Sequence, residues 1–404
     1  MKKDWELKKL KDTCILVRGP FGGSLKKSFF VQNGYAVYEQ SHAIYDQFEK
    51  VRYFINEHKF NEMKRFEVKP GDLIMSCSGT IGKVAIAPVD VGKGIINQAL
   101  LKITPGKTLN IKFLKYWMGS PDFQEKILEN SSGAAIKNVA SVNILSGISI
   151  PIPPLPEQQR IVEILDQSFA AIDQAIENTE TNKEYSEEIY ESYLNEIFGS
   201  LNNEWPSKKI NEVCVIRPPK NEAKNQLSDN SLVSFAPMEY LGINQKFLIP
   251  IQEKKLLEVY GGYTYFAEND VLLAKITPCF ENGKLGIAKN LKNSVGFGSS
   301  EYIVFRPTNE LRSEFLYYYL SREKFRDEGT KYMQGAVGHK RVSLDFVSNY
   351  SIPIPSLQLQ DEIIKRIDIL FEKSTSLISN YGKKIRLLQE FKQSILHKAF
   401  NGEL

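Results

Sequence analysis

The sequence has few cysteines and no apolar run long enough to cross a bilayer. Its four cysteines are scattered without a C-x-x-C pair, so we expect reduced, mostly buried thiols and no zinc site. The N-terminal residues also lack the apolar segment of a secretory signal. Together these absences predict a soluble cytoplasmic protein that does not associate with a membrane.

Motifs for catalytic and cofactor chemistry are missing as well. The chain contains no G-x-x-x-x-G-K-[ST] phosphate loop, no G-x-G-x-x-G after a strand, and no N-P-P-Y or D-P-P-Y sequence of an amino-methyltransferase. Residues 79–83 have the wrong spacing for a phosphate loop. Asp270 and Lys275 form only a weak nuclease-like pair, and the four histidines show no metal-ligand spacing. The sequence therefore predicts no catalytic residue, no metal and no cofactor bound by this chain.

What the sequence does contain is an internal repeat at a spacing of about 200 residues. The sequence WELKKL leads to Cys14, and the related sequence WPSKKI leads to Cys214. SIPIP at 149–153 returns at 351–355, and each copy precedes a long helical pattern. The period suits a whole domain followed by a helix. Such a chain is expected to present two similar surfaces to something that itself comes in two parts.

Each half mixes short β-like runs with turn signals and amphipathic helices, which predicts two copies of one α/β (α+β) domain. Residues 73–75 and 82–87 are typical of a hairpin, and the pattern recurs in the second half at 271–273 and 283–288. We therefore predict a globular domain at 1–153, a central helix at 154–199, a second globular domain at 200–355 and a C-terminal helix at 356–404.

The two helical segments carry apolar residues at heptad spacing and in the same phase. This predicts an antiparallel coiled coil of two helices of roughly 40 residues, each about 60 Å long. The alternative is two independent amphipathic helices, each lying on its own domain. The seam is expected to contain Val162, Leu165, Phe169, Ile172 and Ile176 in the first helix, and Ile364, Ile367, Phe371, Ile378, Tyr381, Ile385 and Leu388 in the second.

The net charge of +4 is unevenly distributed along the chain. Residues 1–150 carry 22 Lys and Arg against 14 Asp and Glu, whereas residues 151–199 carry two against 11. A polyanion would be attracted to the basic globular parts and repelled by the acidic central helix.

Three segments in each half combine glycine, hydroxyl and cationic residues, as a DNA-binding loop requires. Glycines let backbone amides approach a phosphate, and Lys, Arg and Asn can pair with base edges in the major groove. The alternative for each segment is an ordinary solvated turn, but recurrence at matching places favours a shared role. The candidates are Arg18, Gly22, Ser24, Lys26, Lys27, Ser78, Thr80, Lys137 and Asn138 in the first half, and Lys275, Thr277, His339, Lys340 and Arg341 in the second.

Over essentially its full length, the chain resembles the specificity subunit of a type I restriction–modification system. The most specific parts are IPIPPLPEQQRIV at 150–162, the stretch from GDLI at 71–74 to Gly82 and Lys83, and the ending KAFNGEL at 398–404. The second copy departs from this pattern, with SLQLQ at 356–360 where the first has PLPEQ. The departure is typical of a diverged second half.

The resemblance implies two target recognition domains that read the halves of a bipartite, asymmetric sequence in double-stranded DNA, with the two helices as a spacer. It also implies two methylation subunits and motor-nuclease restriction subunits as partners, which would hold S-adenosylmethionine, ATP and Mg²⁺. This chain would then be a non-catalytic part of a complex that methylates adenine and cleaves DNA. The alternatives are a nuclease that cuts DNA alone and a coiled-coil adaptor with no role on DNA.

Overall fold

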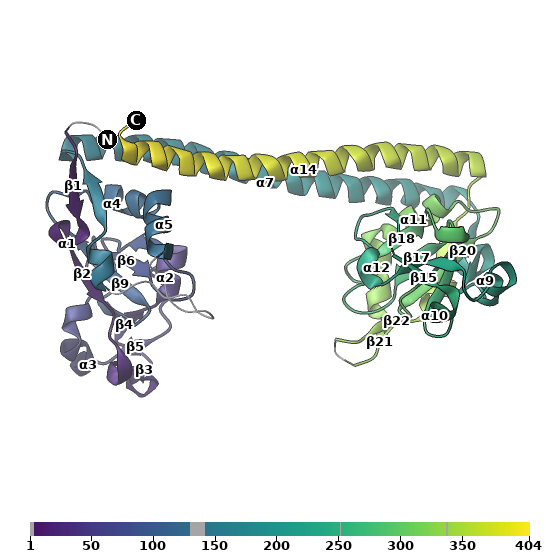
Figure 1. Ribbon diagram of the computed structural model, residues 1–404, viewed down its shortest axis with the longest axis horizontal. Coiled ribbons are helices and arrows are strands. Elements are labelled where there is room, and N and C mark those ends of the chain that lie inside the picture. Colours follow the sequence, from purple (N-terminus) through teal and green to yellow (C-terminus); the bar gives the residue numbers. More distant parts are fainter. Residues whose placement is uncertain (1–3, 130–141, 251, 337) are drawn as a thin grey trace. The chain divides into compact units, whose positions relative to one another are not determined.

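The computed structural model describes residues 4–129, 142–250, 252–336 and 338–404. The chain divides into two compact units, whose elements are labelled in Figure 1. Unit 1 comprises Met1–Glu180 together with Lys383–Leu404, and unit 2 comprises Thr181–Gly382. Each unit therefore contains one globular part and one portion of each of two long helices.

The globular part of unit 1 contains two four-stranded sheets, in the orders β2-β9-β6-β7 and β3-β5-β4-β8. A separate antiparallel pair joins its first and last strands, β1 and β10. The predicted hairpin is confirmed, because β6 pairs antiparallel with β7. The strands are β1 Glu6–Lys9, β2 Cys14–Arg18, β3 Phe30–Val31, β4 Tyr35–Tyr38, β5 Phe54–Ile55, β6 Leu73–Ser76, β7 Val84–Ile86, β8 Gly94–Ile96, β9 Leu100–Pro105 and β10 Ser149–Ile152.

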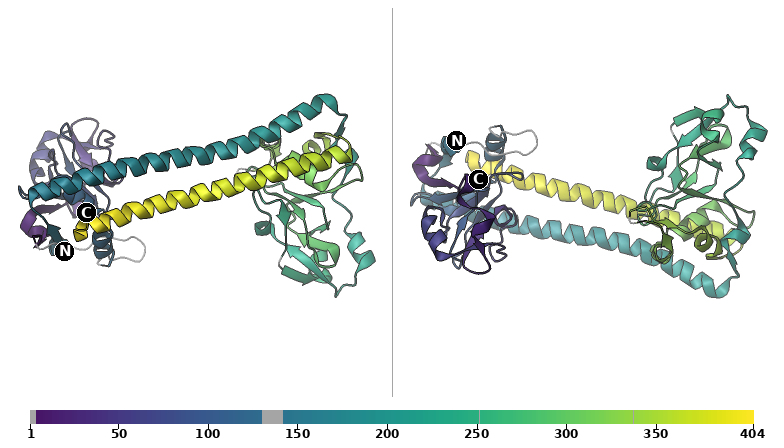
Figure 2. Two further views of the ribbon diagram at one scale, coloured as in Figure 1. Left: turned by 90° about the horizontal axis from the view of Figure 1, so that it is seen from above. Right: turned by 90° about the horizontal axis from the view of Figure 1, so that it is seen from below.

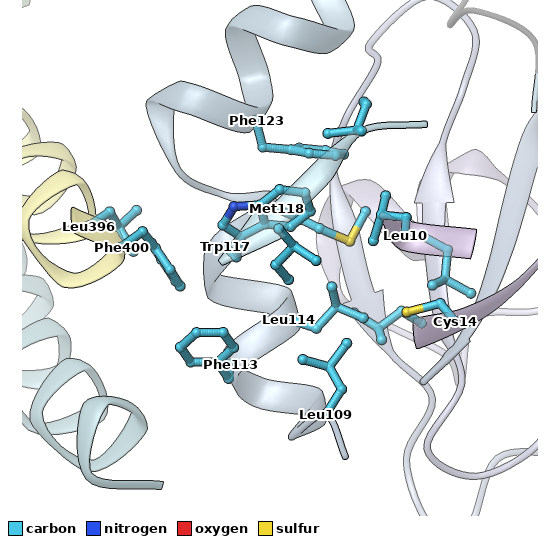
Figure 3. Close-up of a cluster of buried hydrophobic side chains, with 14 of the residues drawn as sticks. Leu10, Cys14, Leu109, Phe113, Leu114, Trp117, Met118, Phe123, Leu396 and Phe400 are labelled. Atoms are coloured by element: carbon cyan, nitrogen blue, oxygen red, sulfur yellow. The ribbon is translucent and has the colours of Figure 1, made fainter. Parts of the chain in front are cut away.

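A helix whose apolar residues share one face closes the core of unit 1. Helix α4, Ile111–Met118, begins after Asn110, whose side chain accepts hydrogen bonds from two backbone amides of the first turn. Phe113 and Trp117 of α4 are buried, and Phe400 packs edge-on against Phe113 with ring centroids 5.1 Å apart (Figure 3). The other short helices are α1 Leu10–Thr13, α2 Gln40–Tyr45, α3 Glu57–Glu62, α5 Pro121–Glu129 and α6 Val142–Ser146.

Among the described residues, unit 2 repeats this plan with three added strands, one in its first sheet and two in a separate pair, β21-β22. Its sheets have the orders β12-β20-β17-β18-β14 and β15-β13-β19-β16, and β11 pairs with β23 as β1 pairs with β10. The second predicted hairpin is also confirmed, by the antiparallel pairing of β17 with β18. The strands are β11 Ser207–Lys209, β12 Cys214–Ile216, β13 Leu232–Ala236, β14 Phe247–Leu248, β15 Gln252–Lys255, β16 Thr264–Ala267, β17 Val271–Ala274, β18 Leu285–Ala288, β19 Val295–Gly298, β20 Tyr302–Pro307, β21 Met333–Gln334, β22 Arg341–Val342 and β23 Ser351–Pro353.

The core of unit 2 is closed in the same way as that of unit 1. Phe198 packs edge-on against Phe315 and Tyr319 of α11, with ring centroids 5.3 and 5.2 Å apart. All three side chains are buried. The short helices are α8 Ile210–Val213, α9 Asn221–Gln226, α10 Leu256–Tyr260, α11 Ser313–Ser321, α12 Glu323–Lys331 and α13 Leu344–Asn349.

The two long helices are α7, Leu155–Glu204, and α14, Leu357–Asn401. The predicted end of the first helix at residue 199 is wrong, because α7 continues through Gly199 to Glu204. One glycine inside a helix costs only about 1 kcal/mol. The buried side chains of Leu194 and Phe198 fix this end of α7 against the core of unit 2, which outweighs that cost. Within the described part of the chain, no helix has the length and apolar character needed to cross a membrane.

In each unit the two long helices run side by side in opposite directions (Figure 2), so they pair as an antiparallel coiled coil. Lys392 donates to Asp173 at 2.6 Å in unit 1, and the Ser374 hydroxyl donates to the Ser186 carbonyl at 2.9 Å in unit 2. The predicted seam residues are all buried or half-buried, namely Val162, Leu165, Phe169, Ile172, Ile176, Ile364, Ile367, Phe371, Ile378, Tyr381, Ile385 and Leu388. At one end each helix also packs on its own domain, since Val162, Leu165 and Ile172 belong to the buried cluster of unit 1, and Ile364 and Ile367 to that of unit 2.

Candidate nucleic-acid interface

The first predicted loop of unit 1 follows β2 and exposes two cations. Ser24, Lys26 and Lys27 are exposed on two short 3₁₀ turns, Gly22–Ser24 and Lys27–Phe29. Arg18 differs from them, because it is half-buried and its Nε lies buried without a hydrogen-bond partner among the described residues. Ser24, Lys26 and Lys27 are thus placed to meet a ligand, whereas Arg18 is partly enclosed.

The second predicted loop of unit 1 is the turn between β6 and β7. Thr80 is exposed and Ser78 is half-buried, and Gly79 has the left-handed φ of 66° that favours glycine. Cys77 points inward, and burial raises the pKa of its thiol to about 12. The third predicted segment, with Lys137 and Asn138, lies outside the described residues.

In unit 2 the structure brings two predicted loops together. The loop after β17 pairs with β22, since the Thr277 amide donates to the Lys340 carbonyl and the Val342 amide donates to the Lys275 carbonyl, both at 2.9 Å. Strands β21 and β22 form a hairpin whose connection exposes His339 and Lys340. Sequence positions more than 60 residues apart thus form one cationic surface, which we call the paired loops of 275–279 and 333–342.

A carboxylate that sequence analysis missed organises this surface. Glu301 accepts two hydrogen bonds from Arg341, from Nε at 2.9 Å and from the terminal nitrogen at 2.7 Å, and it lies 3.7 Å from Lys275. The hydrogen bonds from Arg341 hold the pKa of Glu301 below its usual value. Arg341 is therefore fixed in direction while its side chain remains 45% exposed. No local sequence signal identifies Glu301, because the contact depends on tertiary pairing.

The weak nuclease-like pair in unit 2 does not form a site. Asp270 is buried and receives two hydrogen bonds from Arg306, both at 2.8 Å, whereas Lys275 binds Glu301 and the Ser300 carbonyl. Both groups therefore have structural partners. Across the described residues, no group of three or more His, Cys, Asp or Glu side chains is arranged to hold a metal ion.

The chain contains two copies of one α/β domain. Each copy has exposed cationic loops and half of a helix pair, which defines a duplicated binding protein. The model of the type I restriction modification DNA specificity domain matches residues 2–183 and 202–387. The chain belongs to this family and contains two copies of its domain.

Curated relatives and solved structures agree with this membership. The EcoEI specificity subunit of Escherichia coli is 37% identical over 161 residues, which cover 40% of this chain and 26% of that protein. The EcoKI specificity subunit of E. coli K12 is 23% identical, over 84% of this chain and 76% of that protein. The matched segment therefore spans about a quarter of the length of the EcoEI subunit.

Two solved structures share the fold over the full length of the chain. The crystal structure of the HsdS subunit from Thermoanaerobacter tengcongensis has a TM-score of 0.60 at 18% identity, covering all of this chain and 98% of that one. A structure described as the basis of complex assembly and conformational transition of the type I R-M system has a TM-score of 0.75 at 20% identity, covering all of this chain and 99% of that one.

Proposed function

We propose that this chain is the DNA sequence-recognition and scaffold subunit of a type I restriction–modification complex. Each unit would read one half of a bipartite, asymmetric target in double-stranded DNA. The observation that carries the proposal is the duplication itself: both units place cationic, glycine-containing loops after equivalent strands. Their side chains differ at corresponding places, with Cys77 and Gly79 in unit 1 where unit 2 has Lys275 and Thr277. Different side chains on one scaffold support two different half-sites.

The recognition residues in this proposal are those of the predicted loops. Exposed Lys26 and Lys27 would contact DNA from unit 1, and His339, Lys340 and Arg341 would do so from unit 2. We extend the proposal to Lys137 and Asn138 on sequence grounds alone. The globular ranges 1–153 and 200–355 would be the target recognition domains, and 154–199 and 356–404 the spacer.

The long helices would hold the protein partners. Most of the acidic side chains of α7 are exposed, including Glu163, Glu177 and Glu188. A surface of this sign repels DNA and suits a protein partner. Two methylation subunits would dock on this chain, and restriction subunits would join them. S-adenosylmethionine, ATP and Mg²⁺ would be bound by those partners, so this chain would work without a cofactor of its own in the cytoplasm.

A domain exchange tests the proposal. Residues 1–150 are replaced by the equivalent domain of a relative with a different target, and the methylated motif is determined in cells that also express the methylation subunits. We expect one half of the motif to change and the other half to persist. A motif altered in both halves would contradict separate recognition by the two units. The reciprocal exchange of 200–350 is the matched control and should alter the other half.

Purified chain distinguishes the two rival functions. Incubation with plasmid and Mg²⁺ should leave the DNA intact, whereas a nuclease acting alone would cleave it. Duplex binding should weaken as salt rises, with a linear fall of log affinity against log salt. An adaptor with no role on DNA would show no such binding.

A further inference from the structure

Unit 2 contains a hollow beside the paired loops, and Lys275 is the one predicted candidate among its lining residues. The volume of the hollow is about 330 Å³, and Lys275 is common to the hollow and to the paired loops. The hollow and the exposed hairpin therefore belong to one surface of unit 2. The residues that line the hollow are Arg217, Pro218, Lys220, Tyr263, Thr264, Tyr265, Lys275, Ser300 and Tyr302.

The hollow carries an excess of positive charge. Arg217 is exposed, and among the described residues its side chain has no hydrogen bond or ion pair. Lys220 is held in place, because its Nζ donates to the Tyr260 carbonyl at 3.0 Å and lies 4.8 Å from the centre of that ring. Two carboxylates lie nearby and both already have partners. Glu301 is bound by Arg341, and Glu222, which accepts from Tyr265 of the lining, is bound by Arg306. The charge of Arg217 and Lys220 is thus available to an anion.

The backbone at Arg217 is strained. Its φ of 56° lies in the left-handed region, which costs a residue other than glycine about 1 kcal/mol. The Arg217 amide nevertheless donates to the Val304 carbonyl at 2.9 Å, which fixes this conformation at the end of β12. Strain of this kind is retained mainly at functional sites.

Two positions of this hollow carry uncharged side chains in unit 1. Val17 of unit 1 corresponds to Arg217 of unit 2. In the first sheet of each unit, Val17 is opposite Lys102, and the Arg217 amide donates to Val304. Cys77 of unit 1 corresponds to Lys275 of unit 2. The Cys77 amide donates to the Ala99 carbonyl at 2.8 Å, and the Lys275 amide donates in the same way to the Glu301 carbonyl at 2.9 Å. These two side chains therefore differ between the copies, although Arg18 of unit 1 lies near Cys77 as Arg217 of unit 2 lies near Lys275.

We propose that Arg217 and Lys220 bind a backbone phosphate of duplex DNA next to the half-site read by the paired loops. This inference rests on the proposed function and adds a phosphate subsite to unit 2. A phosphate contact fixes the position of the protein on the duplex and carries no base information. The paired loops would read the bases, and the hollow would hold the strand beside them.

The experiment measures duplex binding by the full chain across a salt series. Each phosphate contact adds about 0.9 to the slope of log affinity against log salt. The double variant R217A/K220A, which removes both cations from that one phosphate, is expected to lower the magnitude of this slope by about 0.9. The affinity of this variant for the target, divided by its affinity for single-base variants of the target, should equal the ratio measured for the unchanged chain. R217K should restore the contribution of that position.

Two further variants separate loss of the contact from loss of the fold. R217G removes the cation and relieves the left-handed backbone, so it should lower the slope by at most about 0.9 without reducing the melting temperature. K365A removes an exposed cation on α14 and should leave the slope unchanged. A slope unaltered in R217A/K220A would overturn the inference while leaving the proposed function intact.

Two other outcomes are decisive. Absence of salt-dependent duplex binding by the unchanged chain would overturn both the inference and the proposed function. A deoxynucleoside monophosphate is titrated in parallel as a source of free phosphate. If it bound the unchanged chain as tightly as the duplex does and lost affinity in R217A/K220A, the hollow would be a mononucleotide site and the duplex assignment would be wrong.

Discussion

Gln158 and Gln360 make the same three hydrogen bonds, each within its own unit. The side-chain oxygen of Gln158 accepts from the Asn110 amide at 2.7 Å, and its nitrogen donates to the carbonyls of Thr108 and Pro153 at 3.0 and 2.8 Å. Gln360 binds the Arg312 amide, the Glu310 carbonyl and the Pro355 carbonyl at 2.8, 2.8 and 3.0 Å.

Both glutamines are fully buried at the start of a long helix. Each one ties the first turn of that helix to the loop before α4 or α11. Since a buried polar group without a partner is costly, the glutamine satisfies backbone groups that would otherwise be orphaned. This connection sets where the globular part of each unit stands on its helix.

Replacing Gln360 by alanine should therefore destabilise unit 2 strongly. The substitution leaves one amide and two carbonyls without partners, and we expect unfolding to be easier by about 3 kcal/mol. Denaturant unfolding followed by circular dichroism measures this change. Gln358, which is exposed in the first turn of the same helix, is the control, and Q358A should change the unfolding free energy by less than about 0.5 kcal/mol. Equal effects of the two substitutions would contradict the role of the buried glutamine.

Glu301 should govern base discrimination by unit 2 rather than affinity. A guanidinium held from the side by a carboxylate keeps its outer N–H groups free for the edge of a guanine. E301Q removes the charge that holds Arg341, so we expect discrimination between the target and single-base variants in the second half to fall about tenfold. The overall affinity for DNA should not decrease, because E301Q removes one negative charge. Binding to a panel of duplexes measures both quantities.

The pH dependence of this contact follows from the lowered pKa of Glu301. Because the carboxyl is ionised above its ordinary pKa, the ion pair is complete at neutral pH and is lost only when pH falls through the lowered value. Discrimination should thus be constant between about pH 6 and about pH 8. The control E258Q changes the same charge on exposed α10 and should leave discrimination intact. A loss in E258Q equal to that in E301Q would refute the specific role of Glu301.

The cysteines should differ sharply in reactivity. Burial raises the pKa of Cys14 to about 11 and those of Cys77 and Cys214 to about 12, whereas Cys279 is only half-buried. The thiolate is the reactive form, and a thiol of pKa 11 is ionised to only about one part in a hundred at pH 9. Iodoacetamide should therefore label Cys279 first in the native chain, as measured by peptide mass spectrometry. Labelling of Cys77 or Cys214 at a comparable rate would contradict this assignment.

Sequence patterns predicted what depends on local periodicity. The hairpin that begins at Leu73 and the seam that includes Leu165 follow from alternation and heptad spacing, which leave a trace in every few residues. The contact between Glu301 and Arg341 leaves none, because it forms only after β20 and β22 have taken their places. The end of α7 at Glu204 was missed for a related reason: packing of Phe198 against α11 outweighs the local preference of Gly199 to end a helix.

The polar part of the helix seam in unit 2 should tolerate loss of a hydrogen bond better than added volume. Ser186 and Ser374 are both buried, and the Ser374 hydroxyl donates to the Ser186 carbonyl across the two helices. S374A keeps the small volume and loses one hydrogen bond, so it should cost about 1 kcal/mol of unfolding free energy. S374L forces a branched side chain between the helices and should cost about 2 to 3 kcal/mol, although leucine suits an ordinary heptad seam.

Denaturant unfolding of the two variants measures these costs. The control is L377A, at an exposed position of α14. L377A should change the unfolding free energy least, because its side chain is 45% exposed. If S374L were more stable than the unchanged chain, leucine would be filling space at the seam. The small residues would then serve some purpose other than close approach of the helices. If S374A alone were strongly destabilising, the hydrogen bond rather than the available volume would hold the helices together at this level.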